Sequence, residues 1–187
     1  GLVGNAWKQV LVLVGSGLAL LGLFQYVVMP DMRWLYAYGW DDHYFRLIGT
    51  LLDPGYLGLL LVLVLVVLEY ENYKYWWLHY GLVFMALMLT YARSAYLVFL
   101  VAVFLLSLYK RSFKYLLVRW GMVLAVMGLF LMLPSPGGEG VNLTRTYSVV
   151  HRVRSVVTAW DLFLEQPVFG VGFNAYRYYT QLDQAAV

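Results

Sequence analysis

One arginine, Arg93, lies in the middle of an apolar stretch that runs from Trp76 to Tyr109. As a single helix this stretch would be roughly 50 Å long, although the hydrocarbon core of a bilayer is only about 30 Å thick. A guanidinium at the centre of such a helix would cost about 3 kcal/mol or more. Two short helices, 77–91 and 95–109, avoid this cost, so the stretch predicts a turn at Arg93. We expect this charge to be functional; the alternative is an anchor that snorkels to the interface.

The composition places the chain among integral membrane proteins. It is 63% hydrophobic and 12% charged, whereas soluble domains carry about 25% charged residues. There is no cysteine, which excludes disulfides, thiol catalysis and thiolate metal sites. The net charge of +3 is too small to indicate a nucleic-acid partner.

Five apolar segments predict an all-α fold, a polytopic transmembrane helix bundle that occupies residues 1–133. The expected spans are residues 10–28, 47–68, 77–91, 95–109 and 115–133. A Pro/Gly-rich link follows, and residues 134–187 are expected to form the start of an extracytoplasmic loop. We expect the chain to be a fragment of a longer protein.

Loop charges predict the orientation of the bundle. Basic residues cluster between the fourth and fifth spans, and positively charged loops face the cytoplasm. Counting spans from there places the loop 31–46 and the Arg93 turn outside, together with everything after Pro134. The cluster comprises Lys110, Arg111, Lys114 and Arg119.

An amphipathic helix is predicted for residues 147–165, because apolar residues recur there at helical spacing. Arg152 falls at the edge of the apolar face and is expected to be partly buried, unless it snorkels. Arg154 is expected to point to water. The outer side would then carry Arg46, Arg93 and Arg152, and clustered guanidinium groups suit a phosphate or diphosphate.

Other polar residues carry weaker predictions. Asp53 interrupts an apolar run and is either functional or a cap for the helix that follows it. His43, His79 and His151 lack metal-ligand spacing, and no metal is expected.

Three segments resemble the O-antigen ligase and polymerase family of bacterial membrane glycosyltransferases. Residues 46–57 resemble its Arg-x-x-Gly-Thr…Pro-Asn segment, with Gly55 where Asn is usual. Residues 90–95 resemble its Thr-x-Ser-Arg turn, with Ala92 in place of Ser. Residues 151–172 resemble an arginine followed about fifteen residues later by Pro-Leu-Phe-Gly-x-Gly; the usual tryptophan of that helix is Val156 here.

The resemblance implies transfer or polymerisation of glycan from an undecaprenyl-diphosphate-linked donor, at the outer face of the bacterial plasma membrane. The implied partners are that donor, a glycan or lipid acceptor, and the bilayer; no cofactor is implied. Arg93 and Arg152 match the arginines that contact the diphosphate, and both are expected to be catalytic. The expected substrate-binding residues are Arg46, Arg154, Gly170 and Gly172.

The family also uses a histidine as the base, later in the outer loop. We expect that residue beyond Val187, so the 187 residues alone are expected to be inactive. Two alternatives from other classes stay open. One is a secondary transporter or lipid-phosphate-binding protein without glycosyl transfer, which would often show paired broken helices. The other is a membrane scaffold, in which the arginines would lie far apart.

Overall fold

The computed structural model describes residues 3–38, 43–70, 75–132, 141–142, 147–172 and 175. These residues form six α-helices and two 3-10 helices, with no strand among them, so the predicted all-α fold is confirmed. The chain divides into two compact units, residues 1–143 and 144–187, and each is described by itself. The predicted Pro/Gly-rich link at 134–140 lies outside the described residues.

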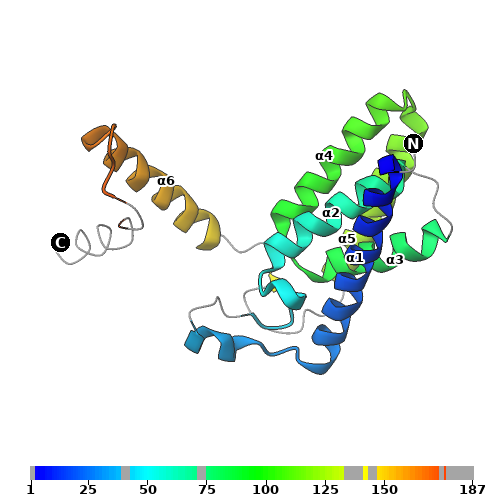
Figure 1. Cartoon of the computed structure of the whole chain (residues 1–187), viewed down its shortest axis with the longest axis horizontal. Helices are drawn as coiled ribbons and strands as arrows, with labels where there is room; N and C mark the ends of the chain where they lie inside the picture. The colour runs from blue at the N-terminus through cyan, green and yellow to red at the C-terminus, as the bar shows by residue number, and fades with distance from the viewer. Residues whose placement is uncertain are drawn as a thin grey trace. The chain divides into compact units, whose positions relative to one another are not determined.

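The first unit contains the helices α1 to α5 and two short 3-10 helices (Figure 1). Helix α2 lies at its centre and contacts α1, α3 and α4, while α5 packs against α4. The 3-10 helices η1 and η2 connect α1 to α2. The bounds are α1 Val3–Val28, η1 Arg33–Tyr38, η2 Gly49–Leu51, α2 Pro54–Tyr70, α3 Trp76–Leu89, α4 Arg93–Tyr109 and α5 Phe113–Met132.

The core of this unit forms around α2, which is mostly apolar and largely buried by its neighbours, while Tyr56, Leu59 and Leu63 stay exposed. Leu57, Leu61 and Leu65 are completely buried along it. Gly58 lets α2 approach α4 closely, because a Cβ atom at this position would lie 2.7 Å from the Cβ of Ala95. This crossing lies within the first turn of α4.

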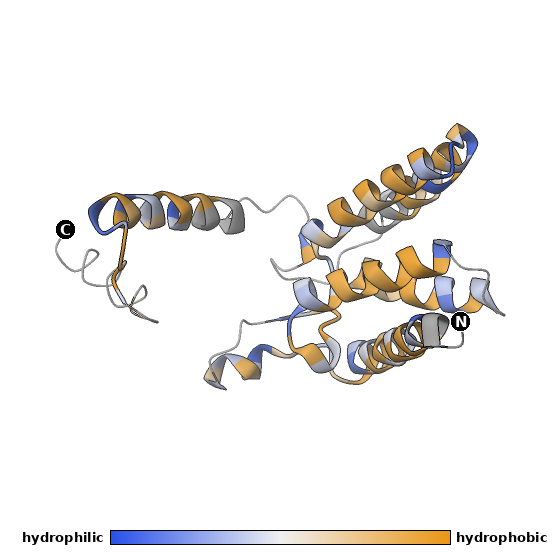
Figure 2. Cartoon of the chain, turned by 45° about the horizontal axis from the view of Figure 1, so that its top comes forward, coloured by the Kyte–Doolittle hydropathy of each residue, from blue (hydrophilic) through white to orange (hydrophobic). Residues whose placement is uncertain are grey.

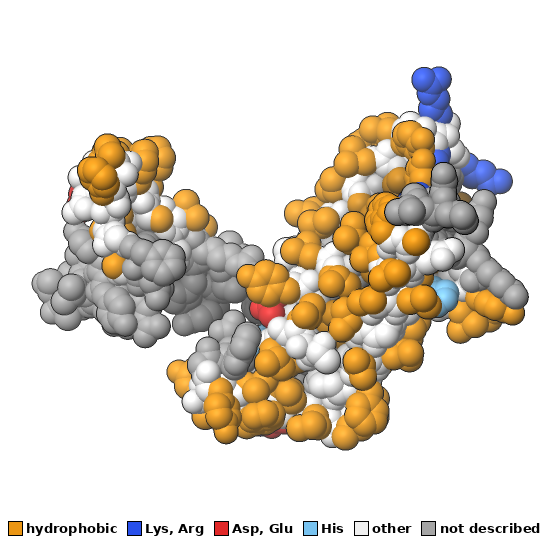
Figure 3. All heavy atoms as spheres, in the orientation of Figure 1, with side chains coloured by type: hydrophobic (Ala, Val, Ile, Leu, Met, Phe, Trp, Pro, Cys, Tyr) orange, Lys and Arg blue, Asp and Glu red, His pale blue; other side chains and the backbone are white. Residues whose placement is uncertain are grey.

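The surface of the first unit is largely apolar. Figure 2 shows mainly hydrophobic residues along its helices, and Figure 3 shows hydrophobic side chains across the face in view. Soluble monomers rarely expose such continuous apolar surface. Of the described helices, one, Ala6–Val28 in α1, is long and apolar enough by itself to cross a membrane; α2, α3 and α4 are apolar but shorter, at 17, 14 and 17 residues.

The helix boundaries place a turn just before Arg93 and start α2 later than the hydropathy indicated. Helix α3 ends at Leu89 and α4 begins at Arg93, so the chain does turn at this arginine. Helix α2 begins at Pro54 and not at Leu47 as the hydropathy predicted. The reason is that Leu52 adopts a left-handed conformation (φ 55°), and Pro54 favours the first position of a helix.

The second unit contains α6, Tyr147–Glu165, which has the predicted bounds. Its apolar residues Val153, Val156 and Trp160 are exposed within this unit. Such a face needs to be covered by lipid or protein.

Candidate functional site

The turn between α3 and α4 is tight and internally hydrogen-bonded. The Oγ1 of Thr90, a fully buried residue, donates to the carbonyl of Leu87 at 2.7 Å and accepts from the amide of Ala92 at 3.2 Å. Tyr91 has a left-handed backbone (φ 50°). Together these features reverse the chain within three residues and place Arg93, which is partly exposed, at the first position of α4.

Arg46 holds this turn from the other side. Its Nε donates to the carbonyl of Thr90 at 3.1 Å, and its Nη2 donates to the carbonyl of Tyr91 at 3.4 Å. The amide of Leu47 donates to the carbonyl of Leu89 at 2.9 Å. The last carbonyls of a helix lack partners within the helix and carry partial negative charge. Arg46, which is 9% exposed, therefore stabilises the end of α3 and the turn that precedes Arg93.

Arg93 lies at the opposite kind of helix end. The N-terminus of α4 carries partial positive charge, and a cation there is unfavourable by a few tenths to about 1 kcal/mol. An anion at this end would be favoured by the helix, by its first N–H groups and by the guanidinium. The start of α4 is thus suited to binding an anionic group.

Left-handed backbone conformations gather around the two arginines. Phe45 (φ 49°) adjoins Arg46, Tyr91 (φ 50°) lies two residues before Arg93, and Leu52 (φ 55°) closes the intervening segment. Non-glycine residues in this region cost of order 1 kcal/mol or more each and occur often at functional sites. This end of the unit is therefore a site candidate.

Gln25 is a residue of this region that the sequence analysis missed. Its Oε1 accepts from the amides of Ile48 and Gly49, at 3.2 and 3.3 Å, and its Nε2 donates to the carbonyl of Met29. Gln25 thereby fixes the segment after Arg46 to α1. The available signal was a carboxamide near the end of an otherwise apolar helix.

Asp53 acts as a cap for α2, which confirms the structural alternative for this residue. Its Oδ1 accepts from the amide of Tyr56 at 2.7 Å. Tyr56 is the third residue of α2 and Asp53 is the residue just before the helix, which is the arrangement expected for an N-cap.

In the loop after α1, Arg33 contacts two other residues of the same loop, Asp31 and Tyr44. Arg33 donates from Nε and Nη2 to the two carboxylate oxygens of Asp31, at 2.9 and 2.6 Å. These hydrogen bonds from Arg33 lower the pKa of Asp31 to about 2. The guanidinium also lies 4.5 Å from the ring centroid of Tyr44. Arg33 is therefore already occupied by Asp31 and Tyr44.

The predicted site residues of the second unit lie on α6 and on the turn that follows it. Arg154 is exposed, as expected. Arg152 belongs to α6, but its side chain lies outside the described part of the structure. The predicted burial of Arg152 and its convergence with Arg93 therefore stay predictions.

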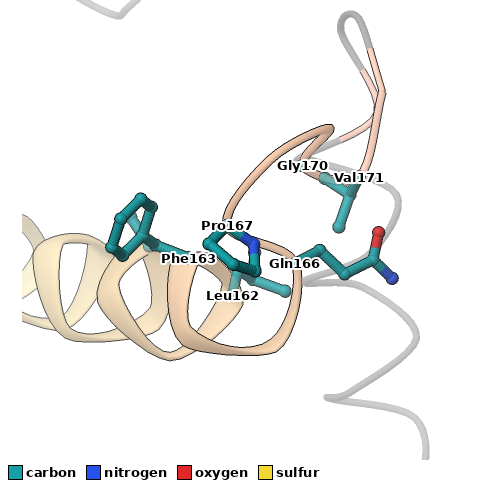
Figure 4. Close-up of a pocket in the computed structure, with 7 residues that line it drawn as sticks. Leu162, Phe163, Gln166, Pro167, Gly170 and Val171 are labelled. Carbon is teal, nitrogen blue, oxygen red and sulfur yellow. The ribbon is translucent and has the colours of Figure 1, made fainter.

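The two predicted glycines have a clear backbone role. Gly170 (φ 58°) and Gly172 (φ 98°) adopt conformations that other residues rarely reach. The amide of Gly170 donates to the carbonyl of Gln166 at 3.0 Å, which folds the chain back over the end of α6. Figure 4 shows the resulting pocket of about 230 Å³. Its lining residues are Ala159, Leu162, Phe163, Gln166, Pro167, Gly170 and Val171.

A second polar cluster, also missed by the sequence analysis, lies at the other ends of α2, α4 and α5. The Nε of Arg119 pairs with the Oε1 of Glu69 at 2.9 Å, where the side chains are 18% and 2% exposed. The hydroxyl of Tyr115 donates to the Oε2 of Glu69 at 2.8 Å, and the Nζ of Lys110 donates to its backbone carbonyl at 2.7 Å. The signal in the sequence was a glutamate at the end of a long apolar run.

The two histidines whose side chains the structure describes, His43 and His79, lie apart from any metal-ligand cluster. Nδ1 of His79 lies 2.8 Å from the Oγ of Ser16, which joins α3 to α1. His43 is buried in the loop after α1. No group of three His, Cys, Asp or Glu side chains is close enough to hold a metal ion among the residues that the structure describes.

Comparison with known proteins gives one match. Residues 78–186, more than half of the chain, match the family described as O-antigen ligase. The matched region contains Arg93, Arg152 and both glycines, whereas Arg46 precedes it. No curated protein and no solved structure matches the sequence.

Proposed function

Since the chain belongs to the O-antigen ligase family, we propose that it transfers glycan from a polyprenyl-diphosphate-linked donor, specifically undecaprenyl diphosphate. The acceptor would be a sugar hydroxyl on a second lipid-linked glycan or on a lipid. The reaction would take place at the outer face of the bacterial plasma membrane, without a cofactor.

The proposed topology has five spans, α1 to α5. The basic turn between α4 and α5 faces the cytoplasm, so the turn between α3 and α4 faces outside. Helix α3 has 14 residues and α4 has 17, which correspond to about 21 and 26 Å. Both are shorter than the hydrocarbon core. The Arg93 turn would therefore be recessed below the outer surface, at the level where a lipid diphosphate lies.

The proposed chemistry is stabilisation of a leaving group. When the glycosidic bond to the donor breaks, negative charge develops on the diphosphate, and preorganised cations and helix N-terminal amides stabilise it. Arg93 and the first amides of α4 would supply the positive charge that stabilises the diphosphate. Arg46 would keep the turn in place while two of its nitrogens remain bonded to carbonyls.

We also propose roles for residues of the second unit, taken by itself. Arg152 would provide a second catalytic guanidinium for the diphosphate, and Arg154 a contact to the substrate. Gly170 and Gly172 would shape the turn after α6 against the substrate. A separate base would activate the acceptor hydroxyl, and we assign that role to none of these residues.

The observation that carries the proposal is the position of Arg93 at the positive end of α4, in a turn that Arg46 clamps. Its test is replacement of Arg93 by alanine in cells that depend on the protein for their glycan product. We expect product to fall about 100-fold or more, as for loss of one stabilising donor in other enzymes. Arg93→Lys should recover little, because an ammonium lacks the guanidinium fork.

Arg33→Ala is the matched control, because Arg33 is an exposed arginine already paired with Asp31. Its product level should stay unchanged. Normal product from Arg93→Ala at normal protein level would refute the role of Arg93. Donor binding by the wild-type protein without any product would favour the lipid-phosphate-binding alternative.

A further inference from the structure

Basic residues gather at the turn between α4 and α5, at the opposite end of the first unit from Arg93. The sequence from Ser107 to Trp120 contains two lysines and two arginines but no acidic residue. Figure 3 shows Lys and Arg side chains projecting from the end of the unit where α4 stops, with hydrophobic side chains covering the adjoining face. This surface therefore combines positive charge with an apolar surrounding.

A pocket of about 400 Å³ lies within this basic surface. It is lined by Ser112, Lys114, Tyr115, Val118 and Arg119. Lys114 is exposed and makes no hydrogen bond or ion pair with any residue that the structure describes. Ser112 accepts from the amide of Tyr115 through Oγ at 3.2 Å, which leaves its hydroxyl proton for another acceptor.

Arg119 is fixed in the wall of this pocket. Its Nε pairs with Glu69 at 2.9 Å, and its guanidinium lies 5.1 Å and 5.2 Å from the ring centroids of Tyr80 and Trp76. These contacts use the Nε of Arg119 and place aromatic rings near its guanidinium plane. The terminal nitrogens retain donors, with one weak contact to the sulfur of Met122 at 4.0 Å. A fixed guanidinium and an exposed ammonium that line the same pocket suit a phosphate.

The surroundings of the pocket identify the kind of phosphate. Val118 in its wall is exposed, as are Phe113, Leu117 and Leu108 beside it. A free phosphate ion would gain nothing from this apolar surface. A phospholipid would place its acyl chains there and its phosphate at the basic residues, as occurs at basic pockets on the cytoplasmic side of membrane proteins.

We propose that this pocket binds the headgroup phosphate of an anionic phospholipid of the inner leaflet. Lys114 and Arg119 are its cationic contacts, and Ser112 donates a hydrogen bond. The inference rests on the proposed orientation of the bundle and goes beyond the proposed glycan transfer at the opposite face. Lipid held here would fix the depth of α4 and α5 in the membrane.

The test is native mass spectrometry of the purified protein, titrated with phosphatidylglycerol or phosphatidylcholine. We expect phosphatidylglycerol to bind at one saturable site and more tightly than phosphatidylcholine. Lys114→Gln should weaken phosphatidylglycerol binding about five-fold, the effect of one lysine near an anionic lipid surface. Because Lys114 is exposed and has no described partner, this variant should fold normally.

Arg111→Gln is the matched control. Arg111 lies three residues away and is exposed, and its loss removes the same unit of charge, but it does not line the pocket. Equal weakening by both substitutions would show diffuse attraction only and would overturn the site. Equal binding of the two lipids, or displacement of lipid by inorganic phosphate, would also overturn it. Glycan product in cells should stay normal in Lys114→Gln, which separates this test from that of the outer site.

Discussion

Two arginines meet one turn of the chain but face opposite electrostatic environments. Arg46 donates to carbonyls of Thr90 and Tyr91, at the negative end of α3, where a cation is favoured. Arg93 begins α4, where a cation is disfavoured. The first arrangement stabilises the fold by itself. The second suits the binding of an anion, so we propose binding for Arg93 and positioning for Arg46.

Replacement of Arg46 by alanine tests this division of roles. Two buried carbonyls would lose their donors, at about 1–3 kcal/mol each, so thermal unfolding in detergent should shift to lower temperature and glycan product should fall. Arg46→Lys should recover stability only in part, because one ammonium does not reproduce a two-nitrogen contact. Unchanged stability of Arg46→Ala would contradict a clamping role.

A second residue-scale prediction concerns the buried pair of Glu69 and Arg119. Removing one partner of a buried ion pair usually costs 3–5 kcal/mol; because Arg119 keeps 18% exposure, we expect about 3 kcal/mol for Arg119→Gln. Glu69→Gln combined with Arg119→Gln should cost less than the sum of the single changes. The measurement is unfolding of all four proteins under the same detergent conditions, and strict additivity would show that the pair does not interact.

At the scale of elements, the sequence predicted helices well and their connections poorly. Hydropathy placed the end of α1 and both ends of α5 within two residues of their positions in the structure. The cost of burying a charge placed a break at Arg93. The start of α2 was misplaced because Leu47, Ile48, Leu51 and Leu52 extend the hydrophobic run of the helix toward the N-terminus. Their course depends on Gln25, whose contacts to Ile48 and Gly49 join residues more than twenty positions apart.

The site was predictable to a similar extent. Residue types and family spacing pointed to Arg93, since an isolated charge in an apolar stretch is visible in the sequence. The contacts of Arg46 with the turn and of Glu69 with Arg119 were not visible, because each joins residues more than forty positions apart. Single-sequence patterns report local periodicity and cannot pair such positions.

Gly58 provides the element-scale prediction. A methyl group at this position would lie 2.7 Å from the Cβ of Ala95, which cannot move aside as a long side chain could. Gly58→Ala should therefore separate α2 from α4, cost about 1–3 kcal/mol and displace the start of α4. Lower thermal stability and lower glycan product are expected together. Gly81→Ala is the control, because its added methyl meets no atom within 4 Å; equal behaviour of the two variants would refute the close crossing.

At the scale of the whole molecule, the proposals depend on which ends of the helices face outside. The outer site requires the Arg93 turn at the external face, and the lipid site requires the α4–α5 turn at the internal face. These two requirements follow from one topology, because α4 joins the two turns directly. Any measurement of sidedness at one turn therefore tests both proposals.

Single-cysteine labelling tests this topology, because the 187 residues contain no cysteine of their own. We expect Tyr36→Cys, at a position 74% exposed in η1, to react with a membrane-impermeant maleimide in intact spheroplasts. Arg111→Cys should react only after the membrane is permeabilised. Ser94→Cys, exposed beside Arg93, should react from outside but more slowly than Tyr36→Cys, because a recessed turn is less accessible. Labelling of Arg111→Cys in intact spheroplasts would place the basic turn outside, which would remove the diphosphate site and the inner-leaflet lipid site together.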